Sequence, residues 1–270
     1  MTQRQIAQDI DLDTGLKMVA QAFTEIASIK LQKIRRRIEK NRIFFEEISE
    51  LFGAVQRLAN KRGIVPRLEK NGTTTLILTS NNKFYGGLER RVLQFYSASI
   101  AKLSTDQILL GRSASDFFNK KAIILEEDLP TEAELQNLTN LIKNYNQVLV
   151  FYPLFKSVLV QTPFAVDLTK SNIAPSKINL DYILEPEIEK MWQFFDSQIL
   201  KLLLEQTFLE AELSRTAARL TSMDQAQEMA NHAIVDLKRA LAVVKRSINN
   251  NRILETESAM HKFRRAHDLG

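Results

Sequence analysis

The sequence predicts an α/β protein in which a central Rossmann-like α/β domain lies between N- and C-terminal helices that form a long antiparallel coiled coil. Three observations lead to this prediction. Gly and Pro are rare toward both ends, apolar residues there follow the spacing of paired helices, and strand and helix patterns alternate in the middle. The expected parts are a first helix over 1–65, an α/β domain over 66–186 and a last helix over 187–270.

Residues that form turns are scarce outside the middle of the chain. Of 270 residues only 8 are Gly and 6 are Pro, and every Pro lies between Pro66 and Pro186. From Glu187 to Leu269 there is neither, which favours an uninterrupted helix. From Glu187 to about His261 such a helix would be roughly 110 Å long at 1.5 Å per residue. Much of it must therefore project beyond its own core.

Both ends carry a seam of apolar residues at alternating spacings of three and four, as in a left-handed coiled coil. The N-terminal seam is interrupted once, at Asn41 and Arg42, and Lys61 with Gly63 and Pro66 predicts the end of that helix. Its members are Leu31, Ile34, Ile38, Phe45, Ile48, Phe52, Val55 and Ala59. The C-terminal seam consists of Phe195, Ile199, Leu202, Gln206, Leu209, Leu213, Thr216, Leu220, Met223, Gln227, Ala230, Ile234, Leu237, Leu241, Val244 and Ile248.

The middle of the chain alternates between strand and helix patterns, which predicts a mostly parallel sheet with helices on its faces. The expected strands are Thr73–Thr79, Gln107–Leu110, Ala122–Leu125, Val148–Tyr152 and Ser157–Asp167, the last two forming a hairpin through Pro153. The expected helices are Leu88–Leu103, a short one at Asp116–Phe118, and Glu132–Lys143. Ser171–Pro186, rich in Asn, Ser and Pro, is the expected linker to the last helix.

Motifs of catalytic or ligand-binding chemistry are missing from the sequence. There is no phosphate loop, no glycine-rich dinucleotide fingerprint, no cysteine, and only three His without metal-ligand spacing. Gly86 and Gly87 fit a tight turn or close backbone approach better than phosphate binding, and Glu126–Asp128 fits a charged loop better than an acid–base pair. We therefore expect no catalytic residue, no cofactor and no metal site, and no apolar run is long enough for a membrane span.

Basic residues cluster on both predicted long helices, in a chain of net charge +5. Such clusters are most often a solvated helix face; aromatic residues interleaved with them, which would favour nucleic acid, are missing. Besides a solvated face and nucleic-acid binding, the third interpretation of the basic clusters is that the coiled coil binds an acidic protein surface. The clustered residues are Lys33, Arg35, Arg36, Arg37, Lys40 and Arg42 in the first helix and Lys238, Arg239, Lys245, Arg246 and Arg252 in the second.

Three segments resemble the gamma subunit of F-type ATP synthases, the central rotor shaft, and they occur along the chain in the same order as in that family. Ala217–Ala230 resembles the family's AARMVAMKNATDNA, Thr79–Leu88 is similar to TSDRGLCGGL, and Ala22–Leu31 resembles AMKMVAAAKL. The match is divergent. Glu25 replaces a Met, Asn81 and Asn82 replace Asp-Arg, Lys245 and Arg246 fall on an Arg-Gln pair, and Arg252 on a Glu. The charged tail from His261 to Gly270 stands where the family has an apolar tip.

The resemblance implies a non-catalytic rotor subunit that couples proton or sodium flow through a membrane ring to ATP synthesis or hydrolysis in an alpha–beta hexamer. It implies alpha, beta and epsilon subunits and the c-ring as partners, no nucleic acid, and a peripheral position on the cytoplasmic face of a bacterial membrane. A coiled-coil adaptor or tether for another acidic protein is the alternative. The residues expected to bind partners are Lys30, Lys33, Arg35, Arg36, Arg37, Arg219, Met223, Lys245, Arg246 and Arg252, and the expected foot-domain motif is Thr79, Ser80, Gly86 and Gly87.

Overall fold

The computed structural model describes residues 2–61, 72–101, 105–170 and 188–267. It divides into two parts, each described here by itself: residues 26–222, which we call the body, and residues 1–25 with 223–270, which we call the terminal helix pair. The expected domain boundaries near residues 65 and 186, and the expected linker Ser171–Pro186, lie outside the described residues. Among those residues, no helix combines the length and the apolar composition needed to cross a membrane.

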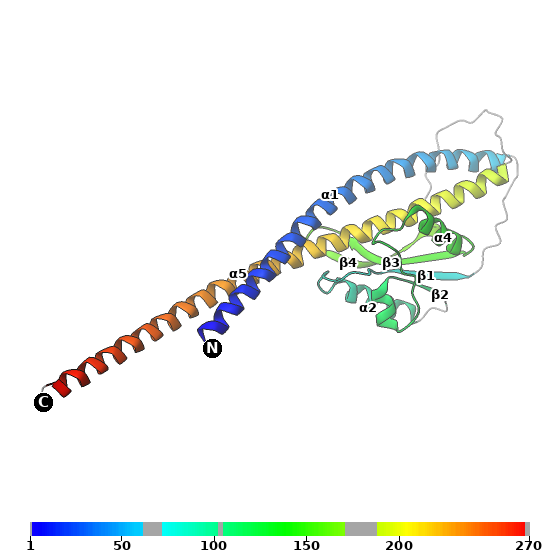
Figure 1. Ribbon diagram of the computed structural model, residues 1–270. Helices are drawn as coiled ribbons and strands as arrows, with labels where there is room; N and C mark the ends of the chain where they lie inside the picture. The colour runs from blue at the N-terminus through cyan, green and yellow to red at the C-terminus, as the bar shows by residue number, and fades with distance from the viewer. Residues whose placement is uncertain (1, 62–71, 102–104, 171–187, 268–270) are drawn as a thin grey trace. The chain divides into compact units, whose positions relative to one another are not determined.

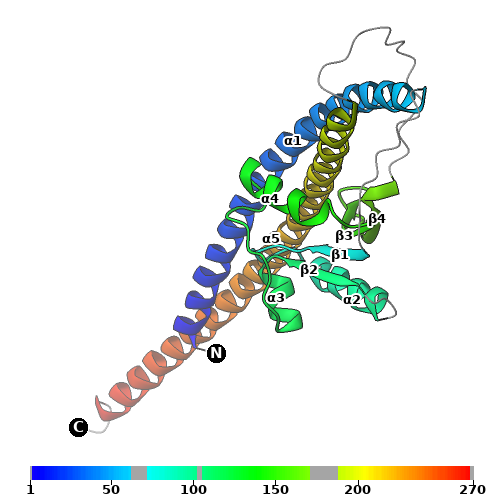
Figure 2. The same ribbon diagram turned by 90° about the vertical axis from the view of Figure 1, so that its right-hand side faces the viewer.

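Two long helices form the ends of the chain: α1, Gln3–Lys61, and α5, Ile188–His267, which is 80 residues long. Within the body they lie side by side and antiparallel (Figure 2). The Phe52 ring of α1 packs against Trp192 of α5, whereas Arg37, earlier in α1, pairs with Glu205, later in α5. The predicted pairing of the two terminal helices is therefore confirmed.

The two predicted seams are the sides of the helices that are covered. All sixteen positions of the C-terminal seam and all eight of the N-terminal seam are buried or half-buried. In the terminal helix pair, the buried apolar residues include Ile6 and Ala20 of α1 and Ala230 and Ile234 of α5. Beyond the seam, residues 249–260 of α5 are all exposed.

The interruption of the N-terminal seam is a polar contact between the helices. Asn41 is buried at the seam position, and its Nδ2 donates to Oε2 of Glu205 at 3.2 Å. The other oxygen of the same carboxylate accepts a hydrogen bond from Arg37 Nη2 at 2.9 Å. A buried polar residue in a seam restricts the helices to the register in which its partner is available.

The α/β domain of the body contains one four-stranded sheet in the order β2-β1-β3-β4 (Figure 1). β1 (Thr73–Leu78) pairs in parallel with β2 (Asp106–Leu110) and with β3 (Gln147–Phe155), and β4 (Gln161–Asp167) pairs antiparallel with β3. Only the last strand, joined to β3 by a short turn, runs against the others. The mostly parallel sheet is as predicted.

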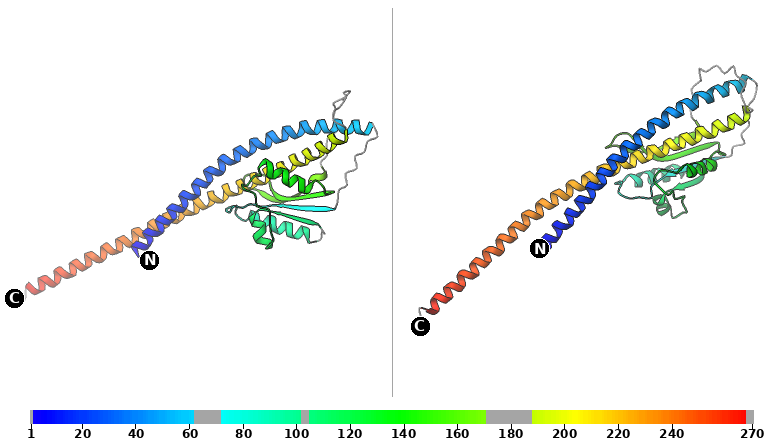
Figure 3. Two further views of the ribbon diagram at one scale, coloured as in Figure 1. Left: turned by 45° about the vertical axis from the view of Figure 1, so that its right-hand side comes forward. Right: turned by 45° about the horizontal axis from the view of Figure 1, so that its top comes forward.

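Helices cover both faces of this sheet (Figure 3). The helices of the domain are α2 (Leu88–Ile100), α3 (Arg112–Phe118) and α4 (Glu132–Ile142). Alternate residues of β1 point to opposite faces: Leu76 packs in a core with Leu138 of α4 and Leu204 of α5, while Ile77 packs with α2. The long helix α5 is therefore part of the core on one face of the sheet.

Two local predictions are wrong. Ala122–Leu125 is not a strand: Ile123 forms a single bridge with Leu110, and the carbonyl of Leu125 is taken by the side-chain amide of Asn81, which ends the pairing. Pro153 does not make the hairpin turn, which lies at residues 156–160. Instead Pro153 sits inside β3 opposite Pro163. It is tolerated because β1 pairs with β3 only as far as Phe151.

Candidate functional site

The segment 79–88, which follows β1, begins by fastening β1 to β2. Thr79 Oγ1 donates to the carbonyl of Leu110 at 2.6 Å and accepts from the amide of Ala114 at 3.1 Å. Gly111, at φ 93°, lies so close that a Cβ there would be 2.3 Å from the Thr79 carbonyl oxygen. This end of the sheet is therefore a close backbone packing with no room for a larger residue at 111.

Gly86 brings the same segment against α5. Its φ of +57° is costly for residues with a side chain, and a Cβ would lie 2.9 Å from Oγ of Ser222. On either side, Tyr85 and Leu88 pack with Ala218 of α5. Gly87, which has open space where a Cβ would be, directly precedes α2. The predicted turn and close backbone approach are confirmed.

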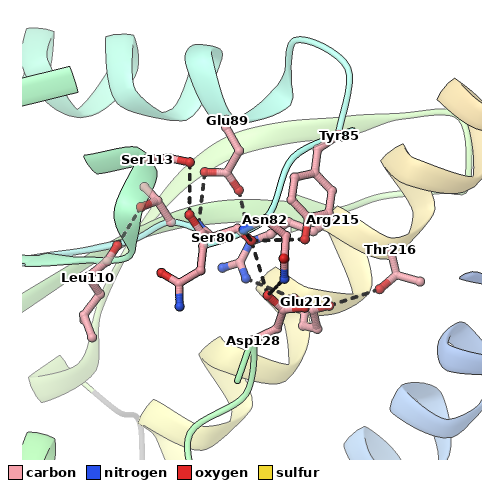
Figure 4. A network of polar contacts seen from close by, with 12 residues as sticks. Ser80, Asn82, Tyr85, Glu89, Leu110, Ser113, Asp128, Glu212, Arg215 and Thr216 are labelled. Atoms are coloured by element: carbon pink, nitrogen blue, oxygen red, sulfur yellow. Dashed lines mark hydrogen bonds and ion pairs between the residues drawn. The ribbon is translucent and has the colours of Figure 1, made fainter. Parts of the chain in front are cut away.

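Two charged residues of α5 are completely enclosed beneath this segment. Glu212 is 0% exposed and Arg215 is 2% exposed, and Arg215 Nη1 donates to Glu212 Oε2 at 3.0 Å. Arg215 also extends toward α2 (Figure 4), where its Nε lies 3.2 Å from Oε1 of Glu89. Glu89 is in the first turn of α2 and its Oε2 accepts the amide of Ser80 at 3.4 Å.

Lys30 of α1 continues this arrangement on the other side of Glu212. Its Nζ lies 2.7 Å from Glu212 Oε1 and 3.0 Å from Asp128 Oδ2. Asp128, between α3 and α4, also accepts from Ser80 Oγ at 3.3 Å and Asn82 Nδ2 at 2.8 Å. Five charges of alternating sign thus connect four segments, and we call this set the charge chain: Asp128, Lys30, Glu212, Arg215 and Glu89.

Burial and pairing move the pKa values of the charge chain in different directions. Burial would lower the pKa of Lys30, but the carboxylates of Glu212 and Asp128 outweigh it and raise that pKa. For Asp128, burial is outweighed by the Lys30 ammonium and the Asn82 amide, which hold its pKa below the ordinary value. Burial raises the pKa of Glu89 against the opposing effect of Arg215. Burial therefore disfavours the charged form of Glu89.

Arg219, one turn further along α5, holds the segment from outside. Its guanidinium carbon lies 4.4 Å from the centre of the Tyr85 ring, within cation–π range. Its Nη2 donates to the Tyr85 hydroxyl at 2.7 Å and to the carbonyl of Lys83 at 3.3 Å. Burial, with the Glu212 charge, raises the pKa of Tyr85 to about 12, so the hydroxyl stays protonated.

The structure separates the predicted site residues into those that bind within the chain and those that face outward. Lys30 belongs to the charge chain, and Ser80 binds two of its members. Thr79 fastens the segment 79–88 to β2, whereas Gly86 and Arg219 lie where that segment meets α5. Arg37 pairs with Glu205, and Arg35 lies over the Phe155 ring at 5.7 Å from its centre. Lys33 and Arg36 are exposed in the body. In the terminal helix pair Met223 is half-buried, and Lys245, Arg246 and Arg252 are exposed.

Four members of the charge chain were not among the predicted site residues: Glu89, Asp128, Glu212 and Arg215. For Asp128 the sequence predicts only a place in a charged loop. A signal for Glu212 and Arg215 did exist, because small residues stand between and beside them at Ala211, Ser214 and Ala217. Small residues on a helix mark a place where another element approaches closely, and charges there must find partners.

The arrangement holds elements together and offers little for chemistry on a bound molecule. Each carboxylate of the charge chain already faces a cation. Within the described part of the chain, no group of three or more His, Cys, Asp or Glu is placed to hold a metal ion. Basic side chains that face outward on the two long helices remain accessible to other molecules. In the body these helices are fastened to the α/β domain.

This combination has a counterpart among known proteins. A family model described as ATP synthase matches residues 2–246, which include α1, the whole sheet and α5 as far as residue 246. The chain belongs to the ATP synthase gamma family. Its curated relatives carry the name ATP synthase gamma chain: the one from Halothermothrix orenii is 26% identical over 86% of this chain and 89% of its own length, and the one from Mycoplasmopsis pulmonis is 24% identical over 85% and 88%.

Solved structures share the fold of this gamma-family chain. A chain of the Euglena gracilis mitochondrial ATP synthase, in a structure of OSCP, F1 and c-ring, has a TM-score of 0.66 at 16% identity, with 98% of this chain and 97% of that chain covered. A chain from the central stalk and c-ring structure of the Tetrahymena thermophila mitochondrial enzyme has a TM-score of 0.57, with 77% and 99% covered. These structures show the shared fold, and membership of the gamma family does not favour the adaptor alternative.

Proposed function

We propose that this chain is the central-stalk rotor subunit of a rotary F-type ATP synthase and carries no catalytic nucleotide itself. Its paired helices occupy the axis of the alpha–beta hexamer, and its α/β domain lies at the foot, against the epsilon subunit and the membrane c-ring. Ion flow through the ring turns the subunit, and the turning helices drive the catalytic beta subunits through their binding states. The subunit is peripheral, on the cytoplasmic face of a bacterial membrane.

The observation that carries this proposal is α5, a single helix of 80 residues that serves both parts of the protein. Between residues 200 and 211 it belongs to the core under the sheet. Its residues 249–260, by contrast, are exposed on every side, including Ile253, Leu254 and Met260 at about 60%. Apolar side chains exposed on a helix indicate a surface that another protein covers. A rotor seated in a ring of larger subunits provides that cover.

Exposed basic residues are the proposed contacts with acidic loops of the hexamer. Lys33 and Arg36 in the body, and Lys245, Arg246 and Arg252 in the terminal helix pair, are available for such contacts. Charge complementarity guides register and encounter more than it adds affinity. A rotating surface needs this property, because strong contacts at one angle would stop it there.

Co-purification with subunit identification tests the proposal. An affinity tag on this chain, expressed with its chromosomal neighbours, should recover alpha, beta and epsilon subunits and the c-ring, and membrane vesicles with the tagged complex should pump protons or sodium ions on addition of ATP. Recovery of the chain without an alpha–beta hexamer would overturn the rotor assignment. Recovery of a different acidic protein in stoichiometric amount would favour a tether instead.

A further inference from the structure

The contact between α5 and the α/β domain changes character along the helix. At Leu200, Leu204 and Phe208 it is apolar and belongs to the core under the sheet. One to two turns further on, it consists of small residues around the enclosed Glu212 and Arg215. Apolar contacts are non-directional, so the first stretch holds the domain on the helix without strictly defining its angle about the helix axis.

The charge chain is directional where the apolar core is not. The planar guanidinium of Arg215 reaches a carboxylate on its own helix and one on α2, a fixed fork geometry that only a narrow range of orientations satisfies. Lys30 likewise binds Glu212 of α5 and Asp128 of the domain at once. Rotation of the domain about the helices would separate Arg215 from Glu89 and Lys30 from Asp128, and leave the carboxylates of Glu89 and Asp128 without their cations.

Stability alone is a weak explanation for such a set. Each buried ion loses its hydration, and replacing buried ion pairs by well-packed hydrophobic residues of similar volume is often neutral or stabilising. Here Arg215 Nε and Glu89 Oε1 are in ion contact but neither makes a hydrogen bond, and both are enclosed. Fixing the register of packed elements is the best-attested use of buried polar groups.

We propose that the charge chain is the angular lock of this subunit: it fixes the orientation of the α/β domain about the paired helices α1 and α5, so that torque applied to the domain reaches the helices without slip. This inference rests on the proposed rotor function. Lys30, Asp128, Glu212, Arg215 and Glu89 act as positioning residues, since none contacts a reacting molecule. The lock differs from the outward basic residues, which act on other subunits.

The test is a triple variant of the whole complex in which the lock loses three of its five charges at nearly constant volume: Glu89→Gln, Glu212→Gln and Arg215→Met. The quantities measured are the amount of assembled complex, the rate of ATP hydrolysis, and the ions pumped per ATP hydrolysed. We expect assembly and hydrolysis within about twofold of the wild type, because the costly case is a buried charge without a partner, and the remaining charges, Lys30 and Asp128, stay paired with each other. Ions pumped per ATP should fall by about threefold or more.

A matched control removes an ion pair that joins α5 to another part of the same α/β domain. Lys201 of α5 pairs with Glu132 of α4, whose side chain is 79% exposed. The double variant Lys201→Met and Glu132→Gln should pump as the wild type does, because exposed pairs constrain little. Arg215→Lys is a second lock variant: it keeps the charge but removes the fork that reaches both carboxylates, and it should lower the pumping ratio with full assembly.

A covalent tie should replace the lock. A Cβ atom at Gly86 would lie 2.9 Å from the Ser222 Oγ, which is near enough for a disulfide, since the two Cβ atoms of a disulfide lie about 3.8 Å apart. The chain contains no other cysteine. In the triple variant with Gly86→Cys and Ser222→Cys, oxidation should restore the pumping ratio and reduction should remove it again. The same cysteine pair in the wild-type background measures any effect of the substitutions themselves.

The outcomes separate the two proposals. A wild-type complex that contains no hexamer would overturn the rotor function and the lock together. A wild-type complex that pumps, beside a triple variant with an unchanged pumping ratio, would overturn the lock alone. If neither the triple variant nor Arg215→Lys assembles, the charges are needed for folding, and the lock is overturned. The lock is also overturned if the triple variant pumps fewer ions per ATP and oxidation of the cysteine pair does not restore that number.

Discussion

Gly86 of the segment after β1 lies so close to Ser222 of α5 that a Cβ atom at Gly86 would stand 2.9 Å from the Ser222 Oγ. Of the two glycines in that segment, Gly86 is the one that lies close to α5. A Cβ atom placed at Gly87 would have no neighbouring atom within 4 Å. This difference shows why two adjacent glycines in one motif have different requirements. At position 86 the left-handed φ and the contact with Ser222 both favour glycine, whereas at position 87 a side chain would meet no neighbouring atom.

We predict that Gly86→Ala lowers the free energy of unfolding by at least about 1–2 kcal/mol, because an alanine at φ +57° is strained. Combining it with Ser222→Ala should recover only the part due to the Oγ contact. Urea denaturation of the purified chain measures both. Gly87→Ala, the matched control, should cost clearly less, and an equal cost at the two positions would contradict this account.

Asp128→Asn should change how stability depends on pH. The pKa of Asp128 is lower in the folded protein than its ordinary value of 3.8. The folded state then binds fewer protons than the unfolded state near that pH, so this group contributes stability above pH 4 that is lost on acidification. The variant should be less stable at pH 7, by about 1–3 kcal/mol, and should lose less than the wild type between pH 6 and pH 3. Denaturation midpoints over that range test it; parallel curves would refute the assignment.

Phe52→Ala should destabilise the helix pairing in the body. The Phe52 ring is 2% exposed and packs on Trp192 and Phe195, with ring centres 5.3 and 5.9 Å away. Truncating a buried Phe costs about 3–5 kcal/mol, and Trp192, the only Trp in the chain, reports the change by its fluorescence. Phe44→Ala is the control on the same helix, because Phe44 is 50% exposed. It should leave both the midpoint and the emission nearly unchanged.

Neutralising Lys33 and Arg36 to Gln should reduce coupled ATP synthesis more than assembly of the complex. Both side chains are exposed, and losing two exposed charge contacts of about 0.2–1 kcal/mol each would lower coupled synthesis by about two- to thirtyfold. Arg37→Gln is the comparison, since Arg37 is engaged with Glu205 within the chain. Synthesis rates per assembled complex decide it; unchanged coupling in the double variant would remove both residues from the partner surface.

The sequence alone was enough to predict the helices and most of the sheet, because these depend on local periodicity. Spacings of three and four mark the covered side of a helix wherever a partner supplies the cover, and the seam from Phe195 to Ile248 is covered throughout. The same reasoning failed at Ala122–Leu125, where a side-chain amide from Asn81 takes the carbonyl that a strand would use. It failed again at Pro153, which lies in a strand because no third strand needs its missing N–H.

The charge chain was decided by tertiary structure. Lys30 and Asp128 are 98 positions apart, and Glu89 and Arg215 further still, so no local pattern connects them. Taken singly, an Asp in an acidic loop is most often solvated, and the sequence predicted for Lys30 a contact with a partner subunit. Only the fold encloses these groups together, and enclosure is what makes partners necessary for them, since a charge removed from water without a partner is too costly to keep.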